Sequence, residues 1–297
     1  MIGAAVARRP ASRWLTRWSR RGLRRQHLLL ASLALVSIFV SSFQAVAQNA
    51  GHCLAASEQG GCVEGRVTDA DGILLPGLHI FFTEPTDRYG HGVLGDAIEW
   101  GGLGYIRQGS AAHGPYEMDD LSLPKTHVFE DLTPRLADLD GDAIPEIIVV
   151  ETDADRGAAL AIYSIATGRI EKLTETPHIG TSHRWLAPLG AADLDGDGAM
   201  ELAYIDRPHL AKTLRIWRFS NNLLTQVAAM KGVTNHRIGE DFISGGIRDC
   251  GDGPEIITAD SRWRQVVATR FVNGELQPKV IGRFEGAKSL ENALNCI

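Results

Sequence analysis

The sequence contains few of the residues and motifs that mark common catalytic and metal centres. Its 297 residues include only 4 cysteines and 4 methionines. It has no C-x-x-C or H-x-x-x-H pair, no H-E-x-x-H zinc motif, no G-x-S-x-G elbow, no phosphate loop and no dinucleotide fingerprint. The sequence therefore does not favour a zinc site, a serine hydrolase or a nucleotide-dependent enzyme.

Acidic residues are absent from residues 1–47, which instead contain eight arginines. An apolar run from His27 to Phe43 follows these arginines and leads to Ala45 and Ala47, at the small-residue positions of a signal-peptidase site. A membrane anchor is the alternative, but the apolar core of about 16 residues is shorter than the ~20 that span a bilayer. We expect a signal peptide over residues 1–47, export to the periplasm or beyond, and no stable membrane insertion after cleavage.

The charge of the remaining chain is strongly negative. Without the eight N-terminal arginines, 22 basic and 36 acidic residues remain, a net charge of −14. This balance argues against nucleic acid or anionic membranes as partners, because both are themselves negative. It fits an exported protein that binds cations, with an unknown protein or a glycan as its ligand.

The four cysteines form an even set, which in an exported chain predicts two disulfides. Three pairings are possible, and we favour Cys53–Cys62, which closes a short loop, with Cys250–Cys296, which attaches the C-terminal residues. A zinc site is the alternative, but the spacing does not support it.

An acidic loop of fixed spacing occurs twice. Its carboxylates are Asp138, Asp140, Asp142 and Glu146 in the first copy, and Asp193, Asp195, Asp197 and Glu201 in the second. A third copy keeps Asp249, Asp252 and Glu255 but is two residues shorter. The copies recur at a period of about 55 residues, which indicates propeller blades or a solenoid array.

Short strand-like segments follow each acidic loop. "EIIVVE", "ELAYID" and "EIITAD" are each followed by a turn and two further segments rich in β-branched or aromatic residues. Together with the strand that precedes the loop, these segments make four short strands per repeat, which predict an all-β fold, a β-propeller of four-stranded blades. We expect about five blades, with four as the alternative. Residues 48–86 are expected to supply N-terminal strands, with completion of a blade as one option. Residues 87–297 are expected to hold the blades and a short C-terminal helix.

The acidic loops match the donor set that calcium prefers, which is six to eight oxygens. The predicted ligands are Asp138, Asp140, Asp142, the Ile144 carbonyl and Glu146, then Asp193, Asp195, Asp197, the Ala199 carbonyl and Glu201. An EF-hand would need a Glu at position 12 and flanking helices, but Val149 and Tyr204 occupy that position. A solvated acidic turn without an ion is the remaining alternative.

The motif D-x-D-x-D-G-x-x-E between strands, inside four-stranded repeats, resembles the FG-GAP or VCBS repeats of integrin-α-like propellers. The strong match covers about Thr133–Gly286. The resemblance implies that the loop between the first two strands of a blade binds Ca²⁺, with two sites here. Ala143 stands where the family has glycine, so we expect a weaker first site if this residue has positive φ.

Histidines and tryptophans are the remaining candidates for chemistry. The residues are His91, His183, His209 and His236, with Trp100, Trp185, Trp217 and Trp263. Each histidine is more simply explained as a hydrogen-bonded turn residue, and the tryptophans as packing between blades. A non-enzymatic binding or scaffold protein is therefore the preferred function. A lectin-like propeller and a propeller-based polysaccharide lyase or hydrolase are the alternatives.

Overall fold

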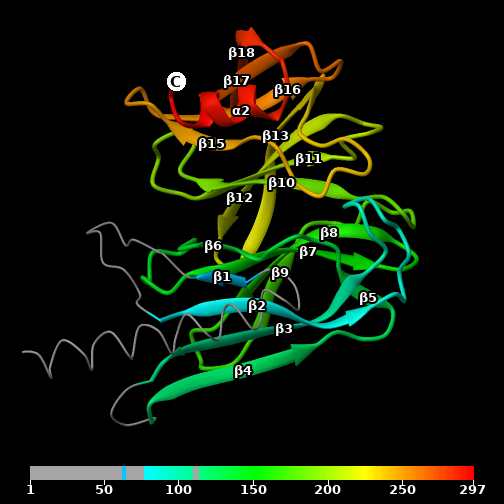
Figure 1. The fold of residues 1–297 in the computed structure, drawn as a ribbon. Helices are drawn as coiled ribbons and strands as arrows, with labels where there is room; N and C mark the ends of the chain where they lie inside the picture. The colour runs from blue at the N-terminus through cyan, green and yellow to red at the C-terminus, as the bar shows by residue number, and fades with distance from the viewer. Residues whose placement is uncertain (1–61, 65–76, 110–113) are drawn as a thin grey trace, which may run out of the picture. The chain divides into compact units, whose positions relative to one another are not determined.

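The computed structural model describes residues 62–64, 77–109 and 114–297. The predicted signal peptide and Cys53, with its predicted disulfide to Cys62, lie outside the described residues. The described residues form antiparallel β-sheets and one short helix, which confirms the predicted all-β, propeller-like fold (Figure 1). None of their helices is long and apolar enough to cross a membrane.

The first described strands form one antiparallel group. They are β1 (Cys62–Glu64), β2 (His79–Thr86), β3 (Glu99–Gln108) and β4 (Tyr116–Ser122). The short strand β5 (His127–Phe129) pairs with both β3 and β7, and so joins this group to the next. Because β2 is the partner of β3, the sheet continues across the boundary expected at residues 86–87.

Three four-stranded units follow in the described residues, and each begins with a short strand before an acidic loop. The first unit comprises β6 (Arg135–Ala137), β7 (Glu146–Asp153), β8 (Gly157–Ser164) and β9 (Glu171–Glu175). The second comprises β10 (Leu186–Ala192), β11 (Glu201–Asp206), β12 (Thr213–Ser220) and β13 (Leu223–Lys231). The third comprises β15 (Gly246–Asp249), β16 (Pro254–Asp260), β17 (Gln265–Val272) and β18 (Glu275–Arg283). A two-residue strand, β14 (Val233–Thr234), pairs with β16.

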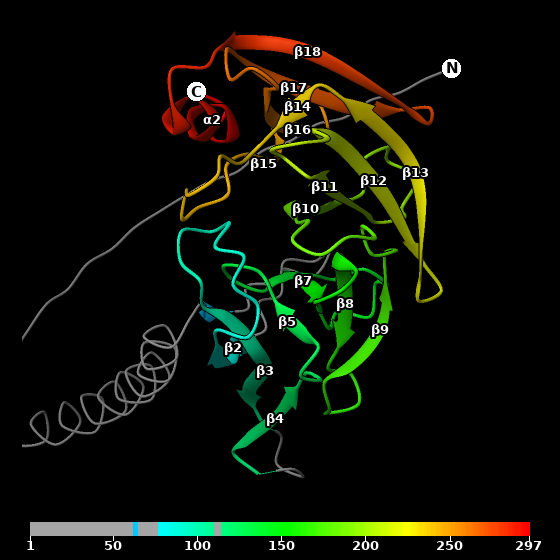
Figure 2. The same cartoon turned by 90° about the vertical axis from the view of Figure 1, so that its right-hand side faces the viewer.

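The three units stack in the manner of blades (Figure 2). Their first strands, β6, β10 and β15, are neighbours in succession. Their last strands, β9, β13 and β18, also follow one another, as Figure 2 shows. The total of five blades remains a prediction, as does its alternative of four.

The core lies between successive units, because the central strands bury both faces. In β7, Ile148 and Val150 pack toward the second unit, while Ile147 and Val149 pack toward the β2–β3 side. This alternation follows from the two-residue period of a strand. In the second unit Trp217 packs into the same core as Ile148, as expected for packing between blades.

The predicted C-terminal helix is α2 (Ala287–Leu294), and its Leu290 and Ala293 pack against the third unit. The predicted disulfide Cys250–Cys296 is present, with 5.8 Å between the two Cα atoms.

Candidate metal centre

The first two acidic loops occupy the predicted place between the first and second strands of their units. The first joins β6 to β7, and the second joins β10 to β11. Strands flank both loops, which agrees with the exclusion of an EF-hand.

Asp138 organises the backbone of the first loop. Its Oδ1 accepts a hydrogen bond from the Gly141 N–H at 2.7 Å, and its Oδ2 accepts one from the Ala143 N–H at 3.0 Å. Asp142 Oδ1 accepts from the Ile144 N–H at 2.7 Å. Ala143 has φ 66°, and a positive φ at this residue is the condition under which a weaker first site was expected. The methyl group of Ala143 strains the loop by about 1 kcal/mol.

Three carboxylates converge in this loop. Oxygens of Asp138, Asp140 and Glu146 lie within 4.8 Å of one another. Glu146 is 1 % exposed, and its Oε2 accepts from the Leu139 N–H at 2.9 Å. Burial raises the pKa of Glu146 to about 7; the Leu139 hydrogen bond opposes this, and the charges of the three aspartates add to it. Asp142 is outside the convergent group, and the Ile144 carbonyl remains a predicted ligand.

The second loop repeats the same backbone pattern. Asp193 accepts from the Gly196 N–H at 2.8 Å and from the Gly198 N–H at 2.9 Å, and Asp197 accepts from the Ala199 N–H at 2.9 Å. Oxygens of Asp193, Asp195 and Asp197 lie within 4.8 Å of one another. Glu201 is buried, as Glu146 is, and accepts from the Leu194 N–H at 2.9 Å. The Ala199 carbonyl remains a predicted ligand.

Comparison with known families agrees with this repeat. Residues 138–204, which begin at the first aspartate of the first loop and include the whole second loop, match the model of the FG-GAP-like repeat. This segment is therefore similar to an FG-GAP-like repeat. No curated protein matches the chain.

The two acidic loops differ in one basic side chain beside their carboxylates, which the motif alone did not indicate. In the second loop, the Arg218 guanidinium lies 2.6 Å from Glu201, 2.8 Å from Asp195 and 2.8 Å from Asp197. In the first loop, none of the ion pairs among the described residues involves Asp138, Asp140, Asp142 or Glu146.

Strand register explains the difference. Arg218 on β12 is paired directly with Glu201 on β11. The pairing of Ile147 with Tyr163, continued by one residue, places Ser164 opposite Glu146 in the first unit. The corresponding residue of the third unit is Arg270, whose Nε lies 3.1 Å from Glu255 Oε1. An arginine thus neutralises the last carboxylate in the second and third copies, and a serine faces it in the first. A residue-by-residue alignment of the repeats would have found this signal.

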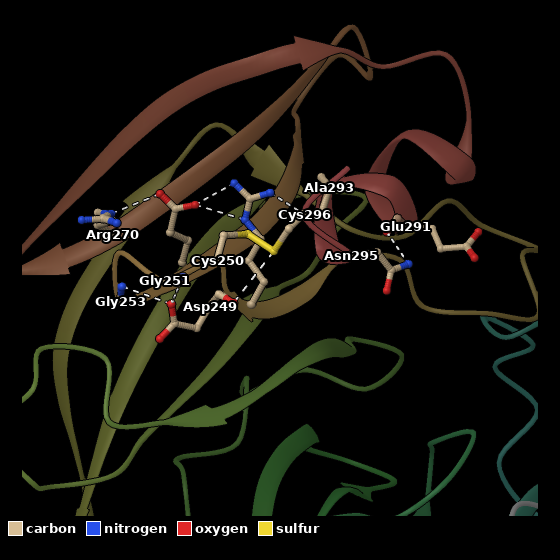
Figure 3. The surroundings of a disulfide bond; sticks show 11 residues. Asp249, Cys250, Gly251, Gly253, Arg270, Glu291, Ala293, Asn295 and Cys296 are labelled. Atoms are coloured by element: carbon tan, nitrogen blue, oxygen red, sulfur yellow. Dashed lines mark hydrogen bonds and ion pairs between the residues drawn. A yellow bond between two sulfur atoms is a disulfide. The ribbon is translucent and has the colours of Figure 1, made fainter.

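The third copy is closed by covalent and ionic contacts (Figure 3). Cys250 lies inside the loop and is joined to Cys296 beyond α2, while Asp249 Oδ1 accepts from the N–H groups of Gly251 and Gly253. Glu255 also pairs with Arg248 at 2.7 Å, and Arg270 donates to the Asp252 carbonyl at 2.6 Å. These residues form no group of convergent carboxylates among those that the structure describes. The loss of calcium binding by the third copy remains a prediction.

The donor set of the first FG-GAP loop fits calcium. All convergent atoms are carboxylate oxygens, the ligands that hard cations prefer. They comprise several negative charges with one buried carboxyl. Burial is the main cause of the raised pKa of Glu146, and a bound cation would offset both this cost and the smaller repulsion from the aspartates. The second loop offers a similar oxygen set, but its charge is already partly neutralised by Arg218.

The four candidate histidines come together outside the acidic loops. His91, His183 and His209 line one cavity of about 160 Å³, and His236 is hydrogen-bonded to His209 at 3.0 Å. The four tryptophans do not gather at one place. Trp185 lines this cavity and Trp217 is buried between units, while Trp100 stacks on Phe82 and Trp263 contacts Phe284.

Proposed function

We propose that this protein is an exported, non-enzymatic binding or scaffold protein whose propeller-like fold is stabilised by calcium. The FG-GAP repeat supports the propeller-like binding role. The charge of −14 without the N-terminal arginines supports a protein that acts through cations. Support for export comes from the tripartite N-terminus and from the disulfide Cys250–Cys296.

The observation that carries the calcium proposal is the difference in counter-charge between the loops. The first loop gathers oxygens of Asp138, Asp140 and Glu146 with no basic partner among the described residues, so an external cation is the group that would neutralise them. In the second loop Arg218 already performs part of this neutralisation. We therefore place the stronger of the two proposed sites in the first loop, although Ala143 alone favoured the second.

Calorimetric titration with Ca²⁺ tests this proposal. We expect Asp140→Asn to remove the tighter binding event, and Asp252→Asn, in the third copy, to leave the titration unchanged. If calcium is at about 100 times the dissociation constant, the site contributes about 2.7 kcal/mol to the free energy of unfolding. Chelation should therefore lower the melting temperature by several degrees. A wild-type protein that takes up no calcium would show that the loops are solvated acidic turns.

Intact-mass measurement after expression with the native N-terminus tests export. We expect a mature chain that begins near Gln48. If all four cysteines are in disulfides, an alkylating reagent should increase the mass only after the protein has been reduced. A retained N-terminus would contradict the proposal.

A further inference from the structure

The histidine-lined cavity lies away from the acidic loops and brings together loops from different units. His91 comes from the loop between β2 and β3, His183 and Arg184 from the loop before β10, and Arg207 and His209 from the loop after β11. Apolar side chains, including Val93, Trp185 and Leu210, complete its lining.

The loop that contains Arg184 is held in place by the core. The Ala158 N–H donates to the Arg184 carbonyl at 2.9 Å, and the Trp185 indole N–H donates to the Glu130 carbonyl at 2.8 Å. Gly157 has φ +78°, and a Cβ there would lie 2.3 Å from the Thr181 carbonyl oxygen, so only glycine permits this close approach. These contacts fix the backbone of the loop that carries His183 and Arg184.

His91 is paired with a buried acid. Its Nδ1 is bonded to Glu130 Oε1, and Glu130 Oε2 accepts from the Thr152 hydroxyl at 2.7 Å. Glu130 is 0 % exposed, and a pair that includes such a buried carboxyl is most stable without net charge. In that state one proton lies between Glu130 and Nδ1, and the second is on Nε2. His91 therefore presents an N–H donor as its remaining polar atom.

His209 presents the opposite polarity. The His236 Nε2–H donates to the Glu240 carbonyl at 2.9 Å, which leaves His236 Nδ1 to accept from the His209 Nε2–H at 3.0 Å. Burial, with the nearby His236 and His91, lowers the pKa of His209 to about 4, so its ring is neutral at pH 7 and its Nδ1 is an acceptor.

The described lining of the cavity contains two guanidinium groups, those of Arg184 and Arg207, and no carboxylate. Arg207 is neutralised by Asp206, whose Oδ1 lies 2.7 Å from its Nε. Arg184 donates to the His183 carbonyl at 2.8 Å, and none of the ion pairs between described residues includes it. A guanidinium without an acidic partner, beside an imidazole N–H donor, suits a carboxylate. A transition metal is disfavoured, because the groups of three convergent ligand atoms in the described residues are confined to the two acidic loops.

We propose that this cavity binds a hydroxylated carboxylic acid of monosaccharide size, such as a uronic acid. The carboxylate would contact Arg184 and His91 Nε2, a hydroxyl would donate to His209 Nδ1, and the apolar wall would face the carbon skeleton. This proposal adds a ligand class to the binding role proposed above, but it does not depend on the calcium loops.

Titration with glucuronate, with glucose as the probe that lacks the carboxylate, tests the inference. We expect glucuronate to bind and glucose to bind at least about tenfold more weakly, because glucose cannot form the charge-assisted hydrogen bonds. Arg184→Gln should weaken glucuronate binding about tenfold or more, and Arg184→Lys, which keeps the charge, should restore part of it. His209→Leu, which removes the acceptor, should weaken the acid and the neutral sugar alike. The exposed Arg262→Gln is the matched control and should change nothing.

A parallel titration with an oligogalacturonide separates a free acid from an acidic glycan as the source of the ligand. Binding of either acid with dependence on Arg184 supports the site. Absence of binding by both acids at about 10 mM, or equal binding of glucose and glucuronate, overturns it. All titrations are run with calcium and with chelator. If the first loop takes up no calcium, glucuronate should still bind to the cavity. If glucuronate does not bind, the first loop should still take up calcium.

Discussion

Arg218 lies directly opposite Glu201 in the antiparallel pair of β11 and β12, with 2.6 Å between its Nε and Glu201 Oε1. The same guanidinium reaches two aspartates of the loop, so one side chain bridges three of its four carboxylates. Because about a quarter of the Arg218 side chain is exposed, each pair contributes little to stability by itself. Its larger consequence is for cation binding, since a metal ion would compete with it for the same oxygens.

We predict that Arg218→Ser strengthens calcium binding by the second loop. The substitution frees Glu201, Asp195 and Asp197 and reproduces the serine found opposite the first loop. Calorimetry should show the second binding event about tenfold or more tighter than in the wild type, since one competing cation has been removed. Arg218→Lys, which keeps the positive charge, is the control and should behave like the wild type. Unchanged affinity in Arg218→Ser would show that the arginine does not compete with calcium.

The converse substitution should weaken the first loop. Ser164→Arg places a guanidinium opposite Glu146, so we expect the tighter calcium event to weaken about tenfold or more. Ser164→Ala keeps the neutral character of the position and should retain the event. Ser164 is 8 % exposed, so circular dichroism must first show that both variants are folded. Unchanged tight calcium binding in a folded Ser164→Arg protein would show that an arginine opposite Glu146 does not weaken the first site.

The third copy should depend on its disulfide and not on calcium. Replacing both Cys250 and Cys296 by serine opens a loop of 46 residues, and should lower the free energy of unfolding by about 2–4 kcal/mol. Asp252→Ala should leave the calcium-dependent change in melting temperature as it is in the wild type. Differential scanning calorimetry with and without calcium measures both effects. A smaller calcium-dependent change in Asp252→Ala would restore the third loop as a metal site.

Glu99 should make the protein less stable as the pH rises. Burial, with the charges of Glu130, Asp96 and Asp131, raises the pKa of Glu99 from 4.5 to about 9. Between these values the native state binds one more proton than the unfolded state. The free energy of unfolding therefore falls with rising pH over this interval, by up to about 1.4 kcal/mol per pH unit. This contribution is fully present below pH 4.5 and is lost by about pH 9.

Glu99→Gln removes the ionisation while it keeps the shape of the side chain. We expect this variant to be more stable than the wild type at pH 8 and to show a flatter dependence of melting temperature on pH. Asp120→Asn, at an exposed position, is the control. Identical pH profiles for wild type and Glu99→Gln would show that Glu99 is ionised in the folded protein at neutral pH.

The sequence by itself determined the repeat, the strand periodicity and the place of the acidic loops. These features are local: alternate aspartates with glycine form the loop, and the following apolar residues form a strand whatever the rest of the chain does. For the same reason the helix at the C-terminus and the positive φ of Ala143 could be anticipated.

The tertiary structure alone decided which side chains meet across strands and between units. Ser164 and Arg218 lie seventeen or eighteen residues beyond the carboxylates they face, and their different effects follow from antiparallel register. The histidines were visible as residues, but their proton donors and acceptors are set by buried partners such as Glu130 and His236. Burial, register and hydrogen bonding depend on contacts between distant segments, so a pattern read along the chain contains no direct record of them.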